Sequence, residues 1–277
     1  MYRMLMALLA AVPLFAHALP PPTPDQLAGA FHDKVKRRQE VPAEVERQYL
    51  GTALGMLQAK GAALDRTQLL TVVDRSPQVQ SLLLFVGDQA QGWKLVGASP
   101  VSTGQTRRHD HYITPTGVYD HDPRGYSDFR AEGSKNDQGV RGYGRRGMRV
   151  WDLGWFTAVK GWGKGESGPV RLQMHATDPD LLESRLGQPA SKGCIRLSGP
   201  LNEFLDHYGA LDRAIEEAAP PGKRPWVLRA DRDTTLAGRY LVVLDSMTDK
   251  RPDWAALPQV RSAKRAATRP APAPQAP

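Results

Sequence analysis

Residues 175 to 196 read HATDPDLLESRLGQPASKGCIR. This stretch contains Cys194, the only cysteine in the sequence, directly after Gly193. His175 stands nineteen residues upstream, at the end of a run of alternating apolar and polar residues, 170–174, that predicts a strand. The segment that follows, 178–186, opens with Asp-Pro and contains helix-compatible residues, so the chain can turn back toward the strand. We therefore expect Cys194 to approach His175.

A cysteine thiol becomes a strong nucleophile when a nearby base takes its proton. The simpler alternative is a buried cysteine and an unrelated surface histidine. Here the thiol lies in a tight Ser-x-Gly-Cys turn, residues 191–194, rather than in an apolar run, and this favours a nucleophile. His175 is then the general acid and base, and the backbone N–H groups of Gly193 and Cys194 are candidates to stabilise an oxyanion.

These residues resemble a known active site. His175, the spacer after it and the sequence from Ser191 to Arg196 are similar to the catalytic motif of the L,D-transpeptidases, the YkuD-like catalytic domain. The upstream segments 101–104 (VSTG) and 114–119 (TPTGVY) resemble two further signatures of that domain, in the right order. The resemblance extends from about residue 81 to residue 208 and implies an α+β fold with a mainly β catalytic domain.

The resemblance implies that the thiol attacks the amide between the third residue of a peptidoglycan stem peptide and its terminal D-alanine, and that a thioester forms. The acceptor would be an amine on another stem peptide or on an envelope protein. A carbapenem is expected to acylate the same thiolate, and no cofactor is implied. Two alternatives stay open: a peptidoglycan amide hydrolase that uses the same site, and, from another class, a non-catalytic cell-wall-binding protein.

The resemblance also implies roles for neighbouring residues. The main-chain carbonyl of Ala176 orients His175, and the Thr177 hydroxyl is placed to assist. Arg196 is placed to bind a substrate carboxylate, because its planar fork suits that group; the alternative is an ion pair with an acid such as Glu203. The predicted substrate-binding set is Arg196, Ser191, Lys192, Thr177 and Tyr143.

Two positions depart from the family pattern. Ala176 stands where the family usually has glycine, and Lys192 stands where it usually has histidine. An ammonium cannot accept a hydrogen bond and carries a full charge at neutral pH unless it is buried. We expect Lys192 to turn into the cleft, where its charge would favour the Cys194 thiolate; the alternative is that it turns to solvent.

The two ends of the chain have distinct compositions. Residues 1–18 combine Arg3, an apolar stretch and a final Ala-His-Ala, which predicts a cleaved signal peptide, with an uncleaved anchor as the alternative. We therefore expect an exported protein of the periplasm or cell envelope. Residues 259–277 are rich in Ala, Pro and Arg and are predicted to be disordered. These ends contribute five of the +8 net charges, so the body is mildly basic, which argues against nucleic-acid binding.

Four regions are expected between the leader and the tail. Apolar residues at helical spacing predict a helical N-terminal segment, 19–78, with two or three helices before about residue 70. The catalytic domain is expected at 79–220, with strands at 82–86 and 93–99 and helices at 201–208 and 211–219. A C-terminal extension, 221–258, is expected to pack on that domain and to contain strands at 226–228 and 240–244.

The segment 120–149 contains six glycines and several aromatic residues, Tyr143 among them. A loop of this length inside a compact domain is usually functional or disordered, so we predict a flap over the cleft, with a surface insertion as the alternative. A second group of potential metal ligands lies nearby. It lacks any specific metal-binding spacing, so we predict no metal site; its members are His109, Asp110, His111, His121 and Asp122.

Overall fold

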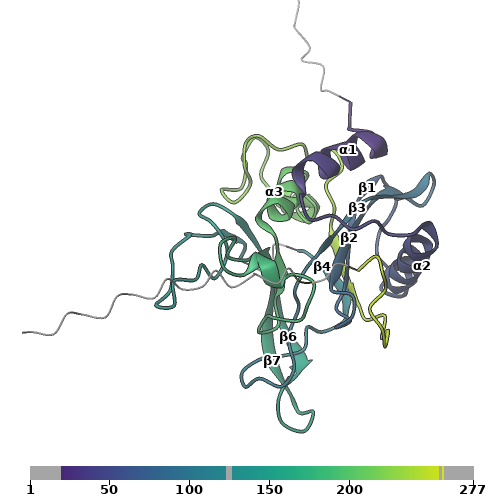
Figure 1. Cartoon of the computed structure of the whole chain (residues 1–277). Helices are drawn as coiled ribbons and strands as arrows, with labels where there is room; N and C mark the ends of the chain where they lie inside the picture. Colours follow the sequence, from purple (N-terminus) through teal and green to yellow (C-terminus); the bar gives the residue numbers. More distant parts are fainter. Residues whose placement is uncertain (1–19, 123–126, 256–257, 259–277) are drawn as a thin grey trace, which may run out of the picture.

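The computed structural model describes residues 20–122, 127–255 and 258. The predicted signal peptide and C-terminal tail lie outside these residues. Two helices come first, α1 (Pro24–Lys34) and α2 (Ala43–Ala59), and two more, α3 (Gly199–His207) and α4 (Arg213–Ala218), follow the candidate site (Figure 1). A short 3-10 helix, η1 (Glu183–Arg185), precedes them. No helix among the described residues is long and apolar enough to cross a membrane.

The strands form two mixed sheets. The five-stranded sheet has the order β3-β2-β1-β9-β4 and the four-stranded sheet has the order β5-β6-β7-β8. This arrangement confirms an α+β, mainly β fold with helices at the N-terminus. The strand bounds are β1 (Gln68–Asp74), β2 (Ser81–Asp88), β3 (Gly92–Pro100), β4 (Gly117–Asp120), β5 (Phe129–Arg130), β6 (Arg149–Val159), β7 (Ser167–Ala176), β8 (Ile195–Leu197) and β9 (Tyr240–Leu244).

Strands β1, β2 and β9 of the five-stranded sheet are buried on both faces, and their side chains alternate between two cores. Helix α2 covers one face (Figure 1). There Leu57 packs in the same hydrophobic cluster as Val72. The other face packs against α1, α3 and the four-stranded sheet, in a core that contains Phe31, Trp151 and Met174. One face of the four-stranded sheet is therefore used for packing, and its other face is left for polar residues.

Three predictions about the regions and their secondary structure need correction. Strand β9 lies between β1 and β4, so the region 221–258 supplies an inner strand of the sheet and is not an extension packed on it. The predicted strand at 226–228 is a turn. The helical segment ends at Ala59, because 68–74 is the buried strand β1; a short apolar run of this kind has no period that separates a buried strand from a helix.

Candidate active site

Strand β7 carries the candidate site on one of its faces. Leu172 and Met174 belong to the hydrophobic core. Side chains alternate along a strand, so Arg171, Gln173 and His175 project from the opposite face. We call this surface of the four-stranded sheet the cleft face, after the substrate cleft that the sequence predicts there.

Strand β8 brings Cys194 to the same face. It runs parallel to β7, with His175 in register with Arg196 and Met174 in register with Ile195. Cys194, one residue before β8, is therefore level with Gln173, and its side chain lies on the cleft face. Its Sγ donates to the carbonyl oxygen of Arg171 at 3.8 Å. Strand pairing thus gathers the thiol and the imidazole from distant parts of the sequence.

The turn before Cys194 is held by the two upstream segments that resemble family signatures. The Thr114 hydroxyl donates to the carbonyl oxygen of Gly193 at 2.7 Å and accepts from the amide of Gly104 at 2.9 Å. A Cβ on Gly104 would lie 1.8 Å from the backbone oxygen of Tyr112, so only glycine allows this approach. The segments 101–104 and 114–119 therefore position the nucleophile's turn.

The His175 ring is fixed by its own neighbour. Nδ1 lies 2.7 Å from the carbonyl oxygen of Ala176, which can only accept, so Nδ1 carries the proton and Nε2 of the neutral ring keeps its lone pair. Burial lowers the pKa of His175 to about 4. The hydroxyl of Thr177 is buried and has no hydrogen-bond partner among the described residues, so it does not assist His175, contrary to our expectation, while its contact with a substrate stays a prediction.

The Cys194 thiol is protonated at rest. Burial raises its pKa, and the nearby Arg196 guanidinium opposes this only in part. A neutral thiol beside a neutral imidazole means that the proton must move when the sulfur attacks. The arrangement therefore suits general-base activation rather than a preformed ion pair.

Arg196 is a half-buried cation without a carboxylate partner among the described residues. Its Nη1 donates to the carbonyl oxygen of Ala190 at 2.9 Å, while its Nε is buried and unbonded. Burial lowers its pKa. The ion pair with Glu203 that we considered is not formed, because Glu203 pairs with Lys34 at 3.1 Å. An uncompensated guanidinium of this kind is suited to receive an anion.

Tyr143 lies over His175, with ring centroids 4.8 Å apart in an edge-on arrangement. Its hydroxyl donates to Oε1 of Gln173 at 3.2 Å. The amide of Arg141 donates to the buried carboxylate of Asp178 at 2.8 Å, which ties this part of the segment 120–149 to the loop after β7. Our sequence analysis missed Gln173, although its place two residues before His175 in an alternating strand was a usable signal.

Two predicted roles in the turn are corrected by its hydrogen bonds. The Gly193 N–H donates to the Ser191 hydroxyl at 3.0 Å, and that hydroxyl donates to the carbonyl oxygen of Cys194 at 2.6 Å. Ser191 is therefore a buried structural residue, and the Gly193 amide is already occupied in this state. The Cys194 N–H has no acceptor among the residues that the structure describes, which makes it the better candidate for an oxyanion donor.

The prediction that Lys192 turns into the cleft is wrong. Its Nζ lies 2.6 Å from Oδ2 of Asp110, and the two side chains are 63% and 61% exposed. The ammonium therefore pairs with Asp110, which lies on a neighbouring surface loop. The charges that influence the pKa of Cys194 are those of Arg196 and Asp152.

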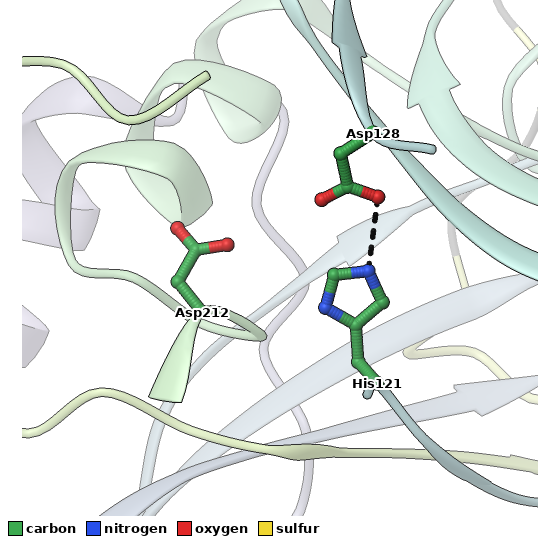
Figure 2. A group of neighbouring side chains, drawn as sticks. All are labelled: His121, Asp128 and Asp212. Carbon is green, nitrogen blue, oxygen red and sulfur yellow. Dashed lines mark hydrogen bonds and ion pairs between the residues drawn. The ribbon is translucent and has the colours of Figure 1, made fainter. Parts of the chain in front are cut away.

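The predicted group of potential metal ligands is not gathered at one point. His109 packs against Trp162, whereas His121 is buried near Asp128 and Asp212 (Figure 2). In that cluster, Nδ1 of His121 donates to the carbonyl oxygen of Leu211 at 2.6 Å, and Nε2 lies 3.0 Å from Asp128.

The guanidinium of Arg149 completes this cluster. Its Nη2 contacts Oδ2 of Asp128 and lies 2.9 Å from Oδ1 of Asp212. A cation of the protein therefore already bridges the two carboxylates. Because both nitrogens of His121 are engaged as well, the cluster is a buried ion network rather than a ready metal centre.

Comparison with known proteins agrees with the resemblance. The family model of the L,D-transpeptidase catalytic domain (YkuD) matches residues 70–208, half of the chain. No curated protein matches the sequence. Among solved structures, the crystal structure of an L,D-transpeptidase (Yku) from Stackebrandtia nassauensis matches at 14% identity and a TM-score of 0.28, covering 87% of this chain and 99% of that one. The family assignment rests on the family model.

Proposed function

Because this chain belongs to the L,D-transpeptidase catalytic domain family, we propose that it is a cysteine-dependent L,D-transpeptidase that acts on peptidoglycan stem peptides. One observation carries the proposal. The register of β7 and β8 puts Cys194 and His175 on one face, and Ala176 fixes the imidazole with Nε2 unprotonated. A nucleophile, its base and the group that orients the base are the parts that covalent acyl transfer needs.

In the first half of the reaction, Nε2 of His175 takes the thiol proton as Sγ of Cys194 attacks the amide carbon. A bond from sulfur to carbon forms, and the oxyanion accepts a hydrogen bond from the Cys194 N–H. When the tetrahedral intermediate collapses, the bond from carbon to nitrogen breaks, and the imidazolium returns its proton to the leaving amine. The products are a thioester on Cys194 and a released D-alanine.

In the second half, an acceptor amine attacks the thioester carbon and gives its proton to His175. The bond from carbon to sulfur breaks, a new amide forms, and the proton returns to the thiolate. Arg196 supports a donor with a carboxylate near the attacked amide, since the guanidinium pairs with no carboxylate among the residues that the structure describes. The acceptor is an amine on a second stem peptide or on an envelope protein.

The test is incubation of the protein with purified muropeptides, followed by mass spectrometry of the products and of the protein itself. We expect a thioester adduct on the wild type, cross-linked products, and neither with Cys194→Ala. A carbapenem should also add its mass to the wild type alone. Trimmed stems without cross-links would favour the amide hydrolase, and unchanged muropeptides retained by the protein would favour a wall-binding role.

We also propose that the protein is exported to the periplasm or cell envelope, on the strength of the leader-like residues 1–18. Mass determination of the N-terminus of the protein purified from cells tests this. A mature chain that begins near residue 19 supports export by a cleaved signal, whereas an intact Met1 in the soluble cytosolic fraction contradicts it.

A further inference from the structure

A second guanidinium stands on the cleft face, across Cys194 from Arg196. On β7, Gln173 is level with Cys194, and Arg171 lies two residues before Gln173. On the other side, His175 lies two residues after Gln173 and is level with Arg196. Strands rise by about 3.3 Å per residue, so the two arginine positions are separated by about 13 Å along the strand, with the nucleophile between them.

Arg171 is held in place by a buried carboxylate. Oδ2 of Asp152, on β6, accepts from Nε of Arg171 at 2.9 Å and also from Nη2. The other oxygen of Asp152 accepts from the amide of Gly154 at 3.1 Å. The Asp152 side chain is fully buried, whereas the Arg171 side chain is 44% exposed. Nη1 of Arg171 has no hydrogen-bond partner among the described residues. One edge of the guanidinium is thus fixed, and the other edge can still donate to an incoming anion.

An irregularity in β6 places an indole beside this guanidinium. The register shifts between Asp152 and Gly154, so that Asp152 is opposite Gln173 and Trp155 is opposite Arg171. Directly opposed residues of an antiparallel pair lie on the same face, and the bulge thus brings both Asp152 and Trp155 to the cleft face. Trp155 is 66% exposed. An exposed indole next to a guanidinium that has one free edge can bind a carboxylate carried at the end of an aliphatic chain.

We propose that Arg171, fixed by Asp152 and flanked by Trp155, binds a carboxylate on the acyl part of the donor, while Trp155 covers the methylene groups that carry it. The inference rests on the proposed function and deepens it. The preferred donor is a peptide with an acidic side chain on the residue whose carbonyl is attacked. Arg196 then serves the carboxylate on the leaving side, and the two arginines align an extended donor across Cys194.

The test measures binding in the full-length chain carrying Cys194→Ala, which cannot react. Two synthetic stem tetrapeptides are titrated by calorimetry, identical except that the side-chain carboxylate of the third residue is free in one and a primary amide in the other. We expect the acid to bind about tenfold more tightly, as a charge-assisted hydrogen bond warrants. The double variant Asp152→Asn with Arg171→Gln should lose this preference, and it avoids leaving Asp152 buried without its partner.

Trp155→Ala should weaken the binding of both peptides, because the methylene groups are common to them. The matched controls are Trp226→Ala and Arg229→Gln, since Trp226 is 74% exposed, the Arg229 side chain is 51% exposed, and neither belongs to the strands of the four-stranded sheet. Both controls should keep the tenfold preference. The inference is overturned if the folded double variant still prefers the acid, or if the starting protein binds acid and amide equally.

A parallel assay of thioester formation in protein with Cys194 intact separates this inference from the proposed function. A preference for the acid without any thioester would refute the proposed reaction and leave the carboxylate site standing. Thioester formation without any preference would refute the carboxylate site alone.

Discussion

The imidazole of His175 donates its Nδ1–H to the main-chain oxygen of Ala176, the next residue, at 2.7 Å. The end of strand β7 itself thus sets the tautomer of the proposed base. In the part of the chain that the structure describes, no acidic side chain orients the ring, and this agrees with the low pKa of about 4, because a carboxylate partner would stabilise the imidazolium. The site therefore holds a weak, neutral base beside a protonated thiol.

The first prediction concerns the pH dependence of acylation. Because the pKa of His175 is about 4, the rate of thioester formation should stay nearly constant from about pH 8 down to about pH 5 and fall only below that, as the imidazole takes a proton. The measurement is the initial rate of thioester appearance by mass spectrometry under saturating donor. An acid limb centred near pH 6.5, the ordinary value, would show that burial does not perturb His175.

The second prediction is that Lys192 does not activate the nucleophile. Its ammonium is paired with Asp110 at the surface, so Lys192→Met should leave the apparent pKa of the Cys194 thiol unchanged. The measurement is the rate of iodoacetamide alkylation as a function of pH. Lys60→Met, at the end of α2, serves as a matched surface control. A clear rise of the thiol pKa in Lys192→Met alone would mean that the ammonium turns into the cleft after all.

The sequence identified the strands at 82–86, 93–99 and 240–244 because their composition or alternation is a local property, and the structure confirms these strands. It did not identify the position of β9 in the sheet. Strand β9 pairs in parallel with β1, whose residues lie about 170 positions earlier, as Thr71 with Leu241 does. Nothing in the residues of either strand specifies so distant a partner. For the same reason, the region 221–258 was misjudged as an addition to the domain.

The candidate site likewise contains residues that the sequence identified and residues that it did not. Cys194 and His175 stand out in the sequence because their residue types are rare and chemically specific. Asp152 was missed because its place on that face follows from the register of β6 on β7 and from the bulge beside it. Gln173 and Arg171 share the face of His175 through the alternation of β7 alone, a signal that our sequence analysis did not use. The orientation of Lys192 was misjudged because its partner, Asp110, is 82 residues away.

The third prediction concerns the buried ion network. Asp128 accepts from His121 and contacts Arg149, so Asp128→Asn removes a partner from two buried cations and should cost about 3–5 kcal/mol of unfolding free energy. Urea denaturation followed by fluorescence measures this. Addition of EDTA should leave the wild-type stability unchanged, since Arg149 already bridges the carboxylates. A large loss of stability in EDTA would instead identify a bound metal.

The fourth prediction gives the network a pH signature. Hydrogen bonding to Asp128 raises the pKa of His121 despite the opposing effect of burial. A group whose pKa is raised on folding stabilises fully below its unfolded value, about 6.5, and loses this contribution as pH rises through the folded value. His121→Gln should therefore cost more stability at about pH 6 than at about pH 9. An equal cost of His121→Gln at both pH values would refute a charged His121.

The last prediction separates catalysis from stability at Arg196. A half-buried guanidinium, with its Nε buried and unbonded and no carboxylate partner among the described residues, costs desolvation energy in the free protein. Arg196→Gln should therefore leave the melting temperature unchanged or higher. If Arg196 receives the donor carboxylate, the same substitution should lower kcat/KM for thioester formation by roughly tenfold to hundredfold, the equivalent of one charge-assisted hydrogen bond. Arg229→Gln, which removes an exposed guanidinium, is the matched control and should alter neither quantity. A lower melting temperature with unchanged activity per folded molecule would make Arg196 a structural residue, held by Ala190 alone.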